Sequence, residues 1–385
     1  MGTSKQFIHN TMIRFYNGEM CRAISQDEVE GIRALAQSGD AVACFKMGRL
    51  VHAAHDLSAS EDYLITAQRW LTKAQQGGVV EADVALAIMM LNGEIEPYNP
   101  RKAIGMLEEA LKKENEFAAY QQLVNLIYGR FGYKKDIDLA EHILDQLLER
   151  STNPWFYDLK GEVLQERGRF ADSEPWLIKA IEGGVTYSYF SLALAQGYDN
   201  NFELRDWDAM IETFRKGADE GNTSCLCYFA YNQMDWYKTL GQEQTEERDE
   251  CRSNIVQVLE ECVDGFNGSA AELLGDIYRE GLCDVPVDYE SAWQCYLRGA
   301  DYYCLGSCYA KMYDMVLQGQ VDRGANRQEY LEQFAVFGAR MRNAHMQDET
   351  VRMYRNGRLT RYAAEIEMFH LPEVERRSSE NGMLD

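Results

Sequence analysis

The sequence predicts an all-α protein, a right-handed α-solenoid of about eight stacked helix hairpins. Two observations predict this fold: one helical motif recurs at intervals of about 38 residues, and a second amphipathic segment precedes its copies. A single hairpin cannot bury its apolar face, whereas stacked hairpins bury one continuous core. The chain has 385 residues, 46% of them hydrophobic and only 6 of them prolines, so it can build such a core.

The recurring motif is the predicted second helix of each hairpin. Its template is Ala67-x-x-Trp70-x-x-Lys73-Ala74-x-x-Gly77, which places small and large residues on one helical stripe. The intervals between successive copies are 36, 37, 33, 38, 44, 37 and 39 residues. The copies begin at Ala67, Ala103, Ala140, Ser173, Ile211, Ile255, Ala292 and Leu331.

The predicted first helix of each hairpin has its own pattern, which is clearest at Ala270-x-x-x-Leu274-Gly275-x-x-Tyr278-x-x-Gly281. This spacing marks one face of a helix, and its small residues let a neighbouring helix approach closely. Weaker versions begin at Met47, Ala82, Ala119 and Leu305. Turns between the helices are predicted by breakers that include Gly93, Pro97, Pro100, Gly129, Gly168 and Pro286.

The chain is expected to divide into an N-terminal cap over residues 1–40, the repeats over 41–342, and a C-terminal capping helix with a tail over 343–385. Residues 27–40 have the pattern of a second helix and its C-cap, which suits a half unit that covers the first repeat.

The C-terminal capping helix is predicted over residues 350–368, with a frayed tail from 371 to 385. Four arginines make this predicted helix locally basic, although the chain as a whole is acidic. They are Arg352, Arg355, Arg358 and Arg361.

The interval of 44 residues predicts an insertion in the sixth unit. The extra segment, residues 241–250, is rich in glutamate, and we expect it to be a solvated loop. Contact of this loop with a partner is the alternative. The motif is also weakest here, so a break or bend in the superhelix is possible over residues 222–262.

The charge balance excludes several classes of partner. The chain has 62 acidic and 39 basic side chains, which gives a net charge of -23. Nucleic-acid binding needs a basic surface, and anionic membranes repel an acidic one, so neither is expected as a partner. No apolar run approaches the roughly 18 residues of a membrane span, and residues 1–10 lack the apolar region of a secretory signal. We therefore expect a cytoplasmic protein.

No metal or cofactor is expected from the cysteines and histidines. Ten cysteines without an export signal predict free thiols that are mostly buried. Neither Cys225-x-Cys227 nor Cys304-x-x-x-Cys308 has a second pair at zinc-like spacing. His52 and His55, with Asp56, are the best metal-like group, but the dipole at a helix C-terminus also favours histidine there.

No catalytic motif is found in the sequence. It lacks a G-x-S-x-G elbow, an H-E-x-x-H zinc motif, a G-x-x-x-x-G-K-[ST] phosphate loop and a G-x-G-x-x-G turn. Pairs of carboxylates such as Glu108 and Glu109 are common in an acidic chain and mark solvated faces. We therefore predict that the protein is not an enzyme.

The spacing and residue types of the two motifs resemble those of the Sel1-like repeats, which are relatives of the tetratricopeptide repeats. The closest stretch is residues 270–300, which matches A-x-x-x-L-G-x-x-Y-x-x-G, a loop with Asp288, and a second helix with Cys295 where a larger residue is usual. The resemblance covers roughly residues 24–340. It implies an adaptor or scaffold that binds a peptide or protein on its concave face, and it carries over no catalytic residue.

The concave groove should be lined by first-helix positions that flank the packing stripe. A polar and partly acidic set of this kind would prefer a basic or polar segment of a partner, attracted by charge. The alternative is a structural or regulatory subunit that assembles through its end caps. The predicted groove residues are Gln121, Asn125, Asp158, Glu162, Gln165, Glu272, Asp276, Arg279, Ser307 and Lys311.

Overall fold

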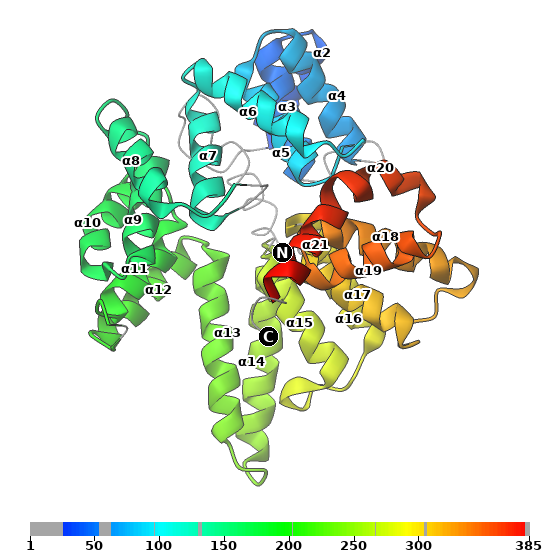
Figure 1. The fold of residues 1–385 in the computed structure, drawn as a ribbon. Coiled ribbons are helices and arrows are strands. Elements are labelled where there is room, and N and C mark those ends of the chain that lie inside the picture. Colours follow the sequence, from blue (N-terminus) through cyan, green and yellow to red (C-terminus); the bar gives the residue numbers. More distant parts are fainter. Residues whose placement is uncertain are drawn as a thin grey trace. The chain divides into compact units, whose positions relative to one another are not determined.

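The computed structural model describes residues 26–53, 63–95, 97–129, 133–201, 203–265, 267–303 and 306–381. These residues form helices joined by short turns and contain no strand; Tyr198 and Leu204 make one isolated antiparallel bridge. Each helix packs on neighbours in the sequence, and consecutive first helices also contact one another in several places. The predicted all-α solenoid is therefore confirmed (Figure 1).

First and second helices alternate along the chain. The first helices are α3 (Ala41–Ala53), α5 (Val80–Leu91), α7 (Glu116–Tyr128), α9 (Pro154–Glu166), α11 (Ser188–Gly197), α13 (Thr223–Thr239), α15 (Gly268–Glu280), α17 (Gly306–Leu317) and α19 (Ala344–Arg355). The second helices are α4 (Tyr63–Gln76), α6 (Pro100–Lys112), α8 (Ile137–Leu148), α10 (Phe170–Glu182), α12 (Trp207–Asp219), α14 (Thr245–Asp264), α16 (Tyr289–Tyr303) and α18 (Arg327–Arg340). Helix α2 (Gln26–Gln37) precedes them.

Each copy of the second-helix template lies in its own helix, from α4 to α18. The first template position is buried in most copies, as in Ala67 and Ala103. The predicted template has no residue at its fifth position, yet this position is fully buried in seven of the eight copies and is the exposed Arg215 in the remaining copy. The buried residues are Leu71, Leu107, Leu144, Leu177, Leu259, Tyr296 and Ala335. The large residue at the fourth position, such as Trp70, is often only half-buried.

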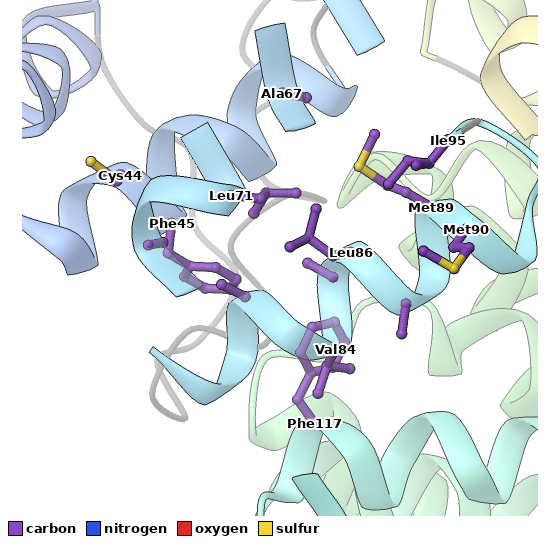
Figure 2. Packing of buried hydrophobic residues seen from close by; sticks show 14 of the residues in the cluster. Cys44, Phe45, Ala67, Leu71, Val84, Leu86, Met89, Met90, Ile95 and Phe117 are labelled. Carbon is purple, nitrogen blue, oxygen red and sulfur yellow. The ribbon is translucent and has the colours of Figure 1, made fainter. Parts of the chain in front are cut away.

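Figure 2 shows how these positions build the core near the start of unit 1, defined below. Leu71 of α4 lies near Leu86 of α5, and Phe117 extends the cluster to α7. All three side chains are buried. The second-helix stripe is thus covered by the first helices on either side of it, as stacking requires.

Asparagine caps the N-terminus of several first helices, a repeated signal that was not recognised in the sequence. In each case the side-chain oxygen accepts a hydrogen bond from a backbone N–H of the first turn, as an N-cap does. The capping residues are Asn115, Asn153, Asn222, Asn267 and Asn343. Second helices α8, α12 and α16 use aspartate instead, at Asp136, Asp206 and Asp288.

Three of these asparagines also join one repeat to the previous one. The Nδ2 atom of Asn115 donates to Glu81 Oε1 at 2.9 Å, and that of Asn153 donates to Glu116 Oε2 at 2.9 Å. Asn222 Nδ2 donates to the carbonyl oxygen of Thr186 at 2.9 Å. Each amide therefore caps its own helix and holds the start of the preceding first helix.

Contacts divide the chain into two compact units. Unit 1 comprises residues 1–95 and 100–229, and unit 2 comprises 96–99 and 230–385. The division falls inside α13, within the range 222–262 where a break or bend was considered. Each unit has its own buried clusters, and the largest cluster of unit 2 is built on α16 to α19.

The C-terminal end differs from the single helix predicted over residues 350–368. Helix α19 ends at Arg355, because Gly357 (φ 77°) and Leu359 (φ 58°) adopt left-handed backbone. A second helical stretch then runs through α20 (Ala363–Glu365), a π-helix (Ile366–His370) and α21 (Leu371–Asn381). The tail expected to fray from residue 371 is thus helical to Asn381.

A buried ion pair joins this closing stretch to α18. Arg340 donates from Nε and Nη2 to the two carboxylate oxygens of Glu365, at 2.9 and 2.8 Å. His370 lies 3.1 Å from Glu365 Oε1; Arg340 and His370 are buried, and the Glu365 side chain is 9% exposed. Burial raises the pKa of Glu365, but the hydrogen bonds from Arg340 and His370 outweigh it and hold that pKa below the usual value.

The insertion over residues 241–250 is mostly helix rather than the predicted loop. Helix α14 begins at Thr245, with Glu246 and Glu247 in its first turn. Carboxylates there interact favourably with the helix dipole, and glutamate is a good helix former. The extra residues therefore lengthen α14 and leave a short turn after α13.

Candidate binding faces on the first helices

The ten predicted groove residues lie on four first helices. We call the five on α7 and α9 the unit 1 face; they are Gln121, Asn125, Asp158, Glu162 and Gln165. We call the five on α15 and α17 the unit 2 face; they are Glu272, Asp276, Arg279, Ser307 and Lys311. Each face lies within one unit.

Polar contacts connect the helices of the unit 1 face. Tyr128 at the end of α7 donates to Glu162 Oε2 of α9 at 2.9 Å. Asp158 of α9 accepts from Ser188 Oγ of α11 at 2.5 Å. Gln165 also reaches α11, where it donates to the carbonyl oxygen of Ser191 at 2.7 Å. The face thus lies on α7 and α9, and its polar contacts also reach α11.

Two residues of the unit 1 face are buried rather than exposed. Asn125 is 0% exposed, and its oxygen accepts from Gln121 Nε2 at 2.9 Å. Its Nδ2 atom has no hydrogen-bond partner among the described residues. Asp158 is 5% exposed. Neither side chain can touch a partner without rearrangement, so the solvent-accessible members of this face are Gln121, Glu162 and Gln165, all half-buried.

A lysine forms the centre of the unit 2 face. Lys311 Nζ of α17 lies 2.8 Å from Glu272 Oε1 and 2.7 Å from both oxygens of Asp276. Ser307 donates to Glu272 Oε2 at 2.9 Å, and Tyr296 donates to Asp276 Oδ1 at 2.7 Å. Arg279 donates to Gln320 Oε1 at 2.9 Å and also interacts with the Tyr296 hydroxyl.

These contacts shift the pKa values of Lys311 and of two tyrosines beside the faces, Tyr296 and Tyr128. Burial would lower the pKa of Lys311, but its hydrogen bonds to Asp276 and Glu272 raise it above the usual value. Burial and the bond to Asp276 raise the pKa of Tyr296. Burial and the nearby Glu162 carboxylate raise the pKa of Tyr128. At neutral pH the lysine is charged and both phenols are protonated.

The two faces are built on the same register. Asp158 and Glu162 lie five and nine residues after the N-cap Asn153; Glu272 and Asp276 lie five and nine after the N-cap Asn267. In both units a serine of the next first helix donates to the first carboxylate, Ser188 in unit 1 and Ser307 in unit 2.

At two further positions of this register, the two units share one residue type and differ in the other. A glycine precedes the second carboxylate in both units, at Gly161 and Gly275. Four residues after the serine, however, unit 1 has the buried Leu192 and unit 2 has Lys311.

Other residues considered from the sequence have structural partners. His52 Nε2 lies 2.7 Å from Glu94 Oε2, while His55, Asp56 and Cys304 lie outside the described residues. No group of metal-ligating side chains occurs in the described part of the chain. The cysteines described are free thiols, and all except Cys283 are buried.

The basic C-terminal segment is also engaged within its own unit. Arg352 contacts Glu349, and Arg355 lies 3.5 Å from Glu375. Arg358 donates to Gln328 at 3.4 Å, and the Arg361 guanidinium lies 4.7 Å from the ring centre of Tyr362. None of the helices in the described ranges is long and apolar enough to cross a membrane.

Two of the solved structures that the chain matches have a Sel1-repeat fold. One is a Sel1 repeat protein from Oxalobacter formigenes, with 15% identity, coverage of 92% of this chain and 95% of the other, and a TM-score of 0.39. The second is a protective antigen of uropathogenic Escherichia coli with an SLR fold, with 18% identity, coverage of 97% and 78%, and a TM-score of 0.37. The chain is similar to Sel1-repeat proteins.

No family model matches the chain, and no curated protein does. The fold of this chain is therefore described from its own helix order, caps and contacts. Its faces are likewise described from its own residues.

Proposed function

We propose that the chain is a protein-binding scaffold that holds a polar or basic segment of a partner along its first helices. One observation supports this proposal: the polar residues predicted for the groove gather into two faces, each spanning consecutive first helices. On the unit 2 face the side chains of Lys311, Glu272 and Asp276 are 26%, 24% and 26% exposed, so solvent and a partner can reach them.

Charge gives the scaffold a preference. A chain with a net charge of -23 attracts basic partners at long range, and this attraction weakens as salt screens it. Hydrogen-bonding groups such as Gln121 and Gln165 suit the peptide groups and neutral side chains of a bound segment. The polar side chains of both faces are held by hydrogen bonds and ion pairs between helices, and we propose binding rather than catalysis.

The experiment is affinity capture of partners with variants of each face. Gln121→Ala with Glu162→Gln alters the unit 1 face, and Glu272→Gln with Asp276→Asn alters the unit 2 face. Matched controls change exposed glutamates of second helices. They are Glu108→Gln in unit 1, which removes one carboxylate as the face variant does, and Glu247→Gln with Glu261→Gln in unit 2.

A partner that wild type and control variants capture, and that a face variant loses, supports the scaffold proposal. Weaker capture at high salt is expected for a partner attracted by charge. If the same partners survive both face variants and high salt, the scaffold proposal is wrong. An assembly through the end caps, the alternative considered above, then explains the captured partners.

A further inference from the structure

The unit 2 face holds two like charges one helical turn apart. Glu272 and Asp276 are at i and i+4 of α15, a spacing at which carboxylates repel each other. The Lys311 ammonium, supplied by α17, lies within 2.8 Å of both carboxylates. It occupies the position where a cation from outside would otherwise be attracted.

Neutral donors complete the coordination of these carboxylates. Ser307 binds Glu272, and Tyr296, which is fully buried, binds Asp276. The Lys311 ammonium also lies 5.5 Å from the centre of the Tyr296 ring, within the range of a cation–π contact. The lysine is therefore held by two charges and an aromatic ring.

Unit 1 shows that this kind of helix contact forms without a lysine. Ser188 binds Asp158 as Ser307 binds Glu272, yet the residue four positions after Ser188 is Leu192. Consecutive first helices thus pack in this register with a leucine at this position as well as with a lysine. Lys311 adds a charge to the face rather than building the stack.

We propose that Lys311 is a specificity-determining residue, which closes the Glu272–Asp276 pair to basic ligands and makes the unit 2 face select neutral polar segments. This inference rests on the proposed binding function and deepens it. A partner lysine would have to displace Lys311 and would only exchange one ammonium for another. The exchange gains little, while the partner still loses its freedom of motion on binding.

Two synthetic peptides, octalysine and octaglutamate, test the inference on the full chain at low salt. Fluorescence anisotropy measures their Kd for wild type, Lys311→Met, and the double variant Glu272→Gln with Asp276→Asn. Glu247→Gln with Glu261→Gln is the charge-matched control. Circular dichroism checks that each variant is folded.

Lys311→Met keeps the length of the side chain and removes its charge. We expect it to bind octalysine about threefold to tenfold more tightly than wild type, the range for one or two partly exposed ion pairs. Adding Glu272→Gln and Asp276→Asn to it should abolish that gain. If folded Lys311→Met gains no affinity for octalysine, the inference is wrong.

The double variant Glu272→Gln with Asp276→Asn tests the same inference by removing the carboxylate charges. Its result does not depend on the stability of Lys311→Met. Removing both carboxylate charges frees the Lys311 ammonium, so binding of octaglutamate should tighten by a similar factor. Binding of octalysine should change no more than in the charge-matched control. A larger loss of octalysine binding would mean that Glu272 and Asp276 already bind basic ligands, which overturns the inference.

These outcomes are separate from those of the capture experiment. The synthetic peptides report on the charge selectivity of the unit 2 face, whether or not a natural partner depends on that face. Failure of the scaffold proposal would appear in the captured partners and not in the peptide affinities.

Discussion

Helix α9 in unit 1 and helix α15 in unit 2 have the same length, the same type of N-cap and carboxylates at the same two positions, but different electrostatic surroundings. In α9 the donors to the carboxylates include the hydroxyl groups of Ser188 and Tyr128. In α15 the donors include the ammonium of Lys311. The repeat register fixes where the carboxylates lie, while the residue that the next helix places beside them, Leu192 or Lys311, differs between the units.

The largest expected effect tests whether the two units unfold separately. Arg340→Met leaves the buried Glu365 carboxylate without its ion-pair partner, which should lower the free energy of unfolding of unit 2 by about 4 kcal/mol. Arg355→Met removes an exposed pair in the same unit and is the control. Thermal unfolding followed by circular dichroism measures both.

In that experiment one buried thiol reports on the opening of each unit. Burial raises the pKa of Cys225 in unit 1 to about 12 and is the main cause that raises the pKa of Cys295 in unit 2 to about 11. Neither thiol alkylates readily at pH 8 until its surroundings open. Arg340→Met should speed the alkylation of Cys295 and leave Cys225 unchanged. Equal acceleration of both thiols would show that the units open together.

The next effect compares the glycines that precede the second carboxylates. A Cβ atom on Gly275 would lie 2.7 Å from Cδ1 of the rigid, buried Tyr296 ring, and one on Gly161 would lie 2.6 Å from Cγ of the more adaptable Leu177. Gly275→Ala should therefore cost about 3 kcal/mol and Gly161→Ala about 1 kcal/mol.

Urea unfolding of the two glycine variants measures this difference. Replacing glycine by alanine raises the helix propensity equally at both positions, so this gain cancels when the two variants are compared. Equal losses would mean that α15 and α9 approach their second helices with equal freedom, contrary to the packing described here.

A smaller effect distinguishes the two tyrosines that donate to the second carboxylate. Tyr296 is fully buried, whereas Tyr128 is 44% exposed. Tyr296→Phe removes a buried bond to a charged group and should cost about 2 kcal/mol; Tyr128→Phe should cost about 0.5 kcal/mol or less. Thermal midpoints at pH 7 give the ranking, which would be reversed if solvent reached Tyr296.

The hydrogen bond between Tyr296 and Asp276 also predicts a loss of stability at alkaline pH. The pKa of Tyr296 is raised in the folded state, so its contribution is complete below the unfolded value of about 10 and is lost as pH rises through the folded value. Wild type should lose stability above about pH 10 more steeply than Tyr296→Phe. Parallel curves for the two proteins would contradict the assigned bond.

The sequence predicted the architecture better than the sites, for physical reasons. Periodicity located the second helices, because their stripe must face the core in every repeat. The template nevertheless omitted the fifth position, where Leu71 and Tyr296 are fully buried, because it was built on the large residue at the fourth position. The binding role of the ten groove residues stays a prediction.

Contacts between helices could not be read from spacing within one helix. Lys311 was selected as a groove residue, but its pairing with Glu272 and Asp276 depends on how α17 is set against α15. The burial of Asn125 and Asp158 likewise depends on neighbouring helices. Such details follow from the register between repeats, which a single sequence does not contain.

The smallest effect concerns the asparagine that starts α9. Asn153 accepts from the Trp155 N–H at 3.1 Å and donates to Glu116 at 2.9 Å, so it joins two repeats as well as capping one helix. Asn153→Ala should cost about 1 kcal/mol through loss of the cap, at any salt concentration.

Asn153→Asp keeps the capping oxygen and places a second negative charge beside Glu116. Its cost should be smaller, on the order of 0.5 kcal/mol at low salt, and should shrink as added salt screens the repulsion. Thermal midpoints of both variants across a salt series measure the two terms separately. If salt affects the two variants equally, Asn153 acts on its own helix alone, and its link to the preceding repeat contributes nothing to the stacking of unit 1.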